Sequence, residues 1–101
     1  MADMFEELRA ELKTFSEEHL PHIPNTYIGR QQAIQEANFI LNKHNGSFYG
    51  LPHIICDERN NPQHIVDENR VRMEIILQIR MSVNKKIFYL GFTADELSCL
   101  L

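Results

Sequence analysis

Three side chains with metal-binding or nucleophilic chemistry lie close together in the middle of the sequence: His53, Cys56 and His64. Imidazole and thiolate are the ligands that zinc prefers, and a cysteine beside a histidine can also act as a nucleophile with its base. However, His53 and Cys56 are three residues apart, which places them on opposite faces of a regular strand. Structural zinc sites also usually contain paired, closely spaced ligands. We therefore treat these residues as weak metal candidates, expect no bound metal, and expect Cys56 to be buried.

Motifs for catalysis are absent from the sequence. It contains no GxSxG nucleophile motif, no glycine-rich phosphate loop and no HExxH zinc motif. With five histidines and two cysteines in 101 residues, a nearby Cys–His pair is expected by chance. We therefore predict no catalytic residues and no cofactor, and an enzyme is the less favoured class of protein.

The negative charge is concentrated in the first twenty residues. This segment carries six acids and two bases, whereas residues 21–101 carry eight of each, so the net charge of -4 arises entirely from it. Glu7, Glu11 and Glu18 fall together on one flank of the helix expected there. Like charges four residues apart slightly destabilise a helix, so this acidic stripe would gain from a basic partner protein. The alternative interpretation is an ordinary solvated helix face.

Two helices are expected in the first half of the chain. The first begins with a capping-box sequence at Asp3 and ends at Pro21. Its apolar residues recur every three or four positions: Phe5, Leu8, Leu12 and Phe15. The second is capped by Asn25 or Thr26 and ends at Gly46. Its apolar face consists of Ala33, Ile34, Ala37, Ile40 and Leu41.

The clearest pattern in the chain is the strict alternation over residues 71–83. All seven odd positions are apolar and five of the six even positions are polar, which is the period of a β-strand. At about 3.3 Å per residue such a strand would be about 40 Å long. A strand of this length must bend at a bulge or overhang its neighbours, and an overhanging end can pair with a second copy of the chain.

This long strand, about 70–83, is predicted to form a hairpin with residues 86–92. A two-residue turn at Asn84-Lys85 would pair Leu77 with Phe92, which puts apolar residues opposite one another on one face. The other face would then carry five residues that we regard as a possible interface: Arg72, Ile76, Arg80, Ile87 and Tyr89. Because three of these are apolar or aromatic, we expect this second face to be partly covered.

Weaker signals complete the predicted fold. Leu51–Asp57 and Gln63–Val66 are candidate strands, and a capping box at Thr93 begins a short C-terminal helix. The order is α-α-β-β-β-β-α. We therefore predict one domain, residues 1–101, of the α+β class, with two N-terminal helices, an antiparallel meander of three to four strands with helices on one face, and a short C-terminal helix.

These features favour a small, non-enzymatic, cytoplasmic protein-binding module of inhibitor, immunity or adaptor type. We expect it to be a homodimer and to bind another protein with a basic surface. No apolar run approaches the roughly 18 residues of a membrane span, the acidic start is unlike a signal peptide, and two cysteines are too few for a disulfide scaffold.

Two other classes of protein stay open. One is a small-ligand-binding or enzymatic scaffold with His53 or His64 at the mouth of an apolar pocket. Its lining would be Phe48, Met73, Leu77, Phe88 and Phe92. The other binds single-stranded nucleic acid through Arg72, Arg80 and Tyr89 on the sheet. Glu74 between these residues and the negative net charge argue against nucleic acid.

Overall fold

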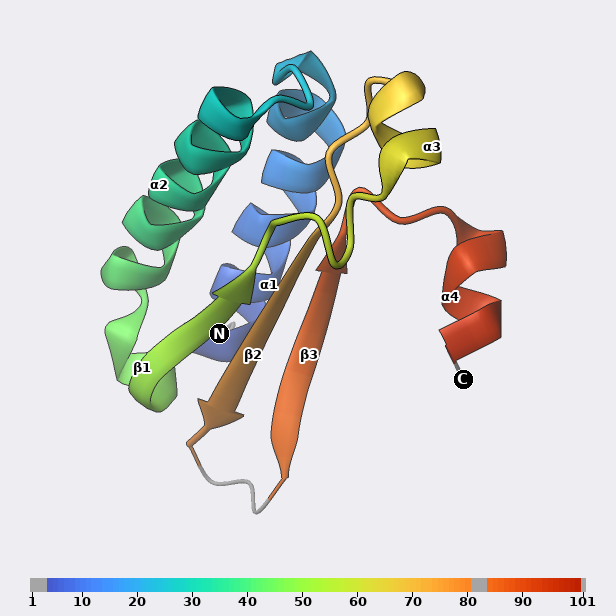
Figure 1. Cartoon of the computed structure of the whole chain (residues 1–101). Coiled ribbons are helices and arrows are strands. Elements are labelled where there is room, and N and C mark those ends of the chain that lie inside the picture. The colour runs from blue at the N-terminus through green and yellow to red at the C-terminus, as the bar shows by residue number, and fades with distance from the viewer. Residues whose placement is uncertain (1–3, 81–83, 101) are drawn as a thin grey trace.

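The computed structural model describes residues 4–80 and 84–100, and it confirms the predicted α+β class. Helices α1 and α2 cover one face of a three-stranded antiparallel sheet of order β1-β2-β3, and a short helix follows the last strand (Figure 1). The helices are α1 (Met4–Thr14), α2 (Tyr27–Lys43), α3 (Gln63–Asp67) and α4 (Ala94–Leu100). The strands are β1 (Phe48–Ile55), β2 (Met73–Ile79) and β3 (Lys85–Leu90).

Helix α1 continues through a π-helical turn, Phe15–His19, into a 3-10 turn, Leu20–His22. The apolar stripe predicted for this helix is confirmed, because Leu8, Leu12 and Phe15 are at most 3% exposed. The next buried residue, Leu20, comes five positions later rather than three or four. Its N–H donates to the carbonyl of Phe15, and this wider turn keeps Leu20 on the buried side. The predicted cap at Asp3 lies outside the described residues.

Helix α2 is capped by Thr26, one of the two predicted residues, whose hydroxyl accepts a hydrogen bond from the N–H of Gly29 at 3.0 Å. Its predicted apolar face is also confirmed, since Ala33, Ala37 and Leu41 are at most 1% exposed. The short connector before α2 passes very close to it. A Cβ atom at position 29 would lie 1.9 Å from the carbonyl oxygen of Pro24, so glycine is required there.

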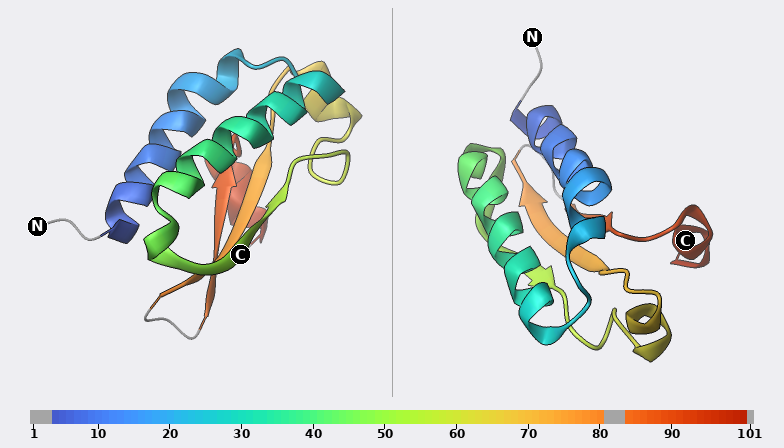
Figure 2. Two further views of the ribbon diagram at one scale, coloured as in Figure 1. Left: turned by 90° about the vertical axis from the view of Figure 1, so that its left-hand side faces the viewer. Right: turned by 90° about the horizontal axis from the view of Figure 1, so that it is seen from above.

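The sheet has the two faces that the alternation predicts. Odd residues of β2 are all at most 7% exposed and belong to the hydrophobic core beneath α1 and α2. Even residues of β2 point to the opposite face, which we call the outer face, and are only partly buried. Helix α4 lies on the side of the sheet opposite to α1 and α2, so the prediction of helices on one face holds for α1 and α2 only (Figures 1 and 2).

The predicted hairpin forms, but its register is wrong. Leu77 pairs with Lys86, not with Phe92, and Gln78 pairs with Lys85, so Asn84-Lys85 is not a two-residue turn. Strand β2 ends at Ile79 and is seven residues long. Met81 and Val83, the last two apolar residues of the alternating pattern, lie outside the described residues. Two registers that differ by an even number of residues place the same side chains on each face of the sheet. The alternating pattern therefore cannot distinguish the predicted register from the observed one.

The segment between β1 and β2 differs from the prediction. Gln63–Val66 is not a strand but lies in the helical turn α3, which begins after Pro62. Four residues are too few to show a period, and only Ile65 of α3 is buried. Irregularity occurs instead in β1, where the pairing shifts between Tyr49 and His53, so that extra residues bulge out opposite β2.

Buried asparagines fix the loop between β1 and α3. Asn61 is 2% exposed, and its amide nitrogen donates to the carbonyl oxygens of Asp57 and Arg72 at 3.1 and 2.9 Å. Its side-chain oxygen accepts from the N–H of Arg72 and from the amide of Asn25. This one side chain therefore connects the loop, the start of β2 and the connector before α2.

Candidate docking surface on the outer face of the sheet

Nine side chains project from the outer face in three rows across the strands. The register gives the rows as Ile55–Glu74–Tyr89, His53–Ile76–Ile87 and Tyr49–Gln78–Lys85. Three of the five predicted interface residues, Ile76, Ile87 and Tyr89, thus lie on this face as expected. Ile76 and Ile87 are direct cross-strand partners and form its centre. The middle row is therefore apolar except for His53, which lies at its β1 end.

The half of this face farthest from α4 is open. Ile87 is 47% exposed and Tyr49 is 50% exposed. Arg80, the residue directly after β2, lies over the Tyr49 ring with its guanidinium carbon 4.4 Å from the ring centre, which is a cation–π contact. Tyrosine and arginine are enriched among the residues that carry most of the energy in protein interfaces. The open half thus has the composition of an interface.

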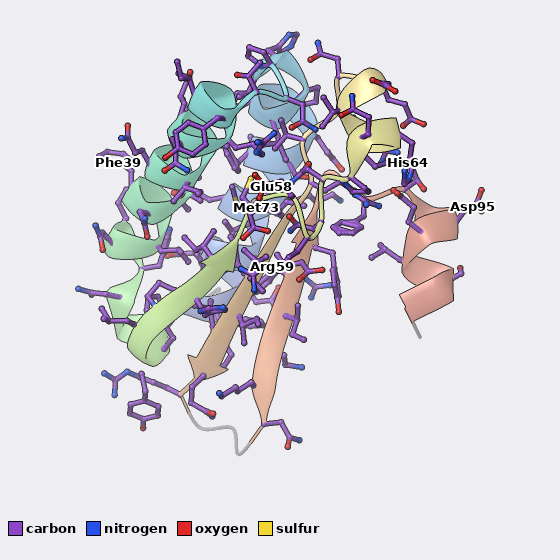
Figure 3. All side chains as sticks on the ribbon, viewed as in Figure 1. Phe39, Glu58, Arg59, His64, Met73 and Asp95 are labelled. Atoms are coloured by element: carbon purple, nitrogen blue, oxygen red, sulfur yellow. The ribbon has the colours of Figure 1, made fainter. Side chains whose placement is uncertain are left out.

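The charge of the outer face is weakly basic. Its nine side chains include the acid Glu74 and the base Lys85, and Arg80 adds a second base beside them. Arg59, in the loop after β1, is 70% exposed but is held by Asp57 at 2.7 Å (Figure 3). A partner surface that combines apolar groups with a few acids would complement this arrangement.

The other end of the outer face is closed by α4 and the loop after β1. Arg72 donates from Nε to the carbonyl of Asn60 at 2.7 Å, bonds to Glu96 and stacks on Phe92 at 4.8 Å. Its side chain is only 13% exposed. Arg72 was predicted as an interface residue, but the structure places it beneath α4 and the loop as an internal contact.

Glu96 is the acid that holds α4 in place. Its carboxylate accepts from Arg70 at 2.6 Å, from Arg72 and from the N–H of Thr93 at 2.8 Å. In return, the N–H of Glu96 donates to the hydroxyl of Thr93, and these two hydrogen bonds form the predicted capping box. Desolvation acts to raise the pKa of Glu96, but hydrogen bonds from Arg70 and Thr93 and the charges of both arginines outweigh it and lower the pKa to about 2.

The acidic stripe of α1 is only partly available. Glu11 lies 2.9 Å from the amine of Lys43 and 3.3 Å from Nε2 of His44, both at the end of α2. The hydrogen bond from Lys43 is the main cause that lowers the pKa of Glu11. Glu7 and Glu18 are exposed. The structure therefore does not bring the three predicted residues together as one free surface.

The weak metal candidates do not converge. His53 lies on the outer face, Cys56 is 4% exposed in the core, and His64 is exposed on α3. Within residues 4–80 and 84–100, no group of three or more His, Cys, Asp or Glu side chains is placed to hold a metal ion. Burial raises the pKa of the Cys56 thiol to about 11, which keeps it protonated at neutral pH and unsuited to act as a nucleophile.

The five residues proposed to line an apolar pocket do not enclose one: three fill the core, whereas Phe88 and Phe92 line a hollow between α1 and β3. Phe48, Met73 and Leu77 are at most 5% exposed and fill the core. Phe92 instead packs edge-on against Tyr89 at 5.4 Å, on the α4 side. The ligand-binding alternative therefore has no pocket formed by the five residues on which it was based.

Sequence reasoning missed several exposed apolar side chains. Leu51 in the β1 bulge is 96% exposed, and Tyr27, Ile28 and Phe39 on α2 are 67–78% exposed. For α2 a signal was present, because this helix combines large apolar residues with very few charges. For Leu51 no signal was present, since the bulge cannot be located from the sequence pattern.

Comparisons with protein-family models, curated proteins and solved structures found no match to this chain. Among the described residues, no helix has both the length and the apolar character needed to cross a membrane.

Proposed function

We propose that this protein is a non-enzymatic protein-binding module of inhibitor, immunity or adaptor type, and that the open half of the outer face is its docking surface. The observation that carries the proposal is the Ile76–Ile87 pair flanked by the Tyr49–Arg80 stack, on a sheet face that α1 and α2 do not cover. Rigid strands hold these side chains in fixed positions, which lowers the entropy lost when a partner binds.

The outer face is a better docking surface than the acidic stripe for two reasons. It contains half-exposed apolar groups, whose removal from water drives association, whereas the stripe offers charges alone. One of the three acids in the stripe, Glu11, also has internal partners. The basic partner expected from the stripe is therefore replaced in this proposal by a partner with apolar and acidic groups.

The proposal also includes a homodimer and a cytoplasmic location. The cytoplasmic location rests on the sequence, whose two cysteines are too few for the disulfide scaffold of a small secreted protein. The described part of β2 is seven residues long, so the proposed homodimer is not argued from an overhanging strand.

A capture experiment with matched variants tests the docking surface. Wild-type protein, Ile87→Arg and Arg80→Glu are used as baits, and Ile28→Arg is the control because Ile28 is also exposed but lies on α2. A protein captured by wild type and control is purified, and its affinity for all four baits is measured by calorimetry. We expect Ile87→Arg to weaken binding at least about tenfold, as for a central interface residue, and the control to bind like wild type.

Two results would reject the docking surface. One is a purified partner that binds Ile87→Arg and Arg80→Glu as tightly as wild type. The other is a combination of two observations. No captured protein depends on Ile87 or Arg80 for binding, and the chain binds a single-stranded oligonucleotide with an affinity that falls steeply with salt and is lost in Arg80→Glu. This result would favour the nucleic-acid alternative.

A further inference from the structure

The exposed surface of α2 is unusually poor in charge. Ten positions of this helix are exposed: Tyr27, Ile28, Gln31, Gln32, Gln35, Glu36, Asn38, Phe39, Asn42 and Lys43. Only two of the ten are charged, whereas four of the six exposed positions among residues 5–14 of α1 are charged. A helix face that stays in water usually carries charges, and interface cores are depleted in them and enriched in aromatic residues. The α2 surface therefore resembles an interface rather than a solvated face.

An apolar groove runs between α2 and the end of α1. It consists of two adjoining hollows of about 330 and 430 Å³ that share Phe15, His19 and Ile40. Glu36 lines one hollow and Lys43 the other, so the only two exposed charges of α2 stand at opposite ends of the groove. Phe39 stands on its rim, 67% exposed on the outward side of α2 (Figure 3).

We propose that a second copy of this chain occupies the groove, with the two α2 helices packed antiparallel about a twofold axis that passes between Phe39 and Ile40. Phe39 of each copy then enters the groove of the other, next to Phe15 and Ile40. A surface with a protruding ring beside a hollow can bind a second copy of itself. The twofold axis places each Phe39 ring in the groove of the other copy, and this symmetric pair of contacts closes the assembly as a dimer.

The charges of α2 support this arrangement. In an antiparallel pair centred between positions 39 and 40, residue 36 of one copy faces residue 43 of the other. Glu36 and Lys43 are seven residues apart, about 10.5 Å along the helix. Glu36 of each copy therefore faces Lys43 of the other copy, which gives two contacts between opposite charges in each dimer. Lys43 lies 2.9 Å from Glu11 of its own chain, but its side chain is 46% exposed and lies along the Phe39 ring at 5.3 Å, so its amine can also contact Glu36 of the second copy.

The α2 groove is thus the interface of the homodimer that the proposed function includes, and the outer face of the sheet takes no part in it. The two surfaces lie on different layers of the fold, so each chain of the dimer keeps its outer face open to a partner (Figure 2). Variants of α2 therefore test the dimer separately from the variants that test the docking surface.

The first test measures mass against concentration by sedimentation equilibrium for wild type, Phe39→Ala and a control, Glu58→Lys. Glu58 is exposed in the loop after β1, away from α2. We expect wild type and control to form a dimer of about twice the chain mass of 11.9 kDa. Phe39→Ala should raise the dissociation constant at least about 100-fold, since a hot-spot side chain is lost twice, with an unchanged circular dichroism spectrum.

The second test uses charge reversal in Glu36→Lys and Lys43→Glu. Each variant alone places like charges opposite one another at both contacts, so each homodimer should dissociate at least about tenfold more readily. Mixed in equal amounts, the two variants restore an opposite charge at both contacts. The mixture should therefore form heterodimers with nearly wild-type affinity, detected by native mass spectrometry. The double variant should also dimerise.

Three results would overturn the inference. Wild-type protein could remain a monomer at several hundred micromolar. A dimer could form that Phe39→Ala and both charge reversals leave unchanged, which would place the interface elsewhere. The mixed single variants could fail to form heterodimers although the double variant and both single variants are folded, which would reject the antiparallel pairing.

Discussion

The attachment of α4 through Glu96 makes a quantitative prediction. The carboxylate of Glu96 joins α4 to Arg70 and Arg72, and its side chain is 22% exposed. Glu96→Gln keeps the size of the side chain and some of its hydrogen bonds but removes the charge that neutralises two arginines. Since Leu97 N–H donates to Thr93 in the first turn of α4, amide exchange at Leu97 reports whether this helix is formed and docked.

The magnitude follows from the pKa of Glu96. The pKa falls from 4.5 to about 2 in the folded protein, and a shift of about 2.5 units corresponds to about 3 kcal/mol. Because glutamine still accepts hydrogen bonds, we expect a loss of about 2 kcal/mol in the free energy of docking α4, or about thirtyfold faster exchange at Leu97. A lowered folded pKa stabilises the protein above the unfolded value, so this contribution is present near pH 7 and disappears as the pH falls from 5 toward 2.

Hydrogen exchange followed by NMR measures the effect at pH 7 and again near pH 3. Glu68→Gln is the matched control, because Glu68 lies 2.7 Å from Arg70 but is 54% exposed. Its loss should remain below about 0.5 kcal/mol, as for an exposed ion pair. The reasoning is refuted if Glu96→Gln and Glu68→Gln exchange equally fast at Leu97, or if the difference between wild type and Glu96→Gln is as large at pH 3 as at pH 7.

Three further predictions concern stability and reactivity. Asn61→Ala should lower the free energy of unfolding by about 3 kcal/mol in urea denaturation, because buried partners of its side chain lose their hydrogen bonds; an effect no larger than that of the exposed Gln63→Ala would contradict this. Gly29→Ala should cost about 2 kcal/mol or more, since its Cβ would meet the Pro24 carbonyl at 1.9 Å, and a thermal midpoint equal to that of wild type would disprove the close approach. Cys56, with its pKa raised to about 11, should resist iodoacetamide in folded protein at pH 8 and react after unfolding; rapid labelling of its peptide in the native state would be inconsistent with the buried position.

The alternating pattern of residues 71–83 predicts which side chains share a face but not which residues pair. The predicted partner of Leu77, Phe92, and the observed partner, Lys86, are six residues apart. Because six is even, Ile76, Ile87 and Tyr89 stay on the same face in both registers. The outer-face residues of β2 and β3 could therefore be predicted from the sequence, whereas the register, the loop and the contribution of β1, including Tyr49, could not.

The contacts of Arg72 could not be predicted, because they depend on residues far away in the sequence. Asn60 and Glu96, its hydrogen-bond partners, are 12 and 24 residues away and belong to different segments. The sequence indicates only that Arg72 lies on the outer face, where an arginine can be free or held internally. The short helix α3 is a similar case, since its five residues are too few to show a period and only Ile65 among them is buried.

The most direct test of the docking surface is footprinting of the complex with the purified partner. Hydroxyl-radical labelling of Tyr49 and acetylation of Lys85 report on the open half of the outer face, and Tyr27, which is 70% exposed on α2, serves as the reference. We predict that the partner strongly reduces labelling at Tyr49 and Lys85 and leaves Tyr27 unchanged. Unchanged labelling at Tyr49 and Lys85 in a saturated complex would contradict the proposal.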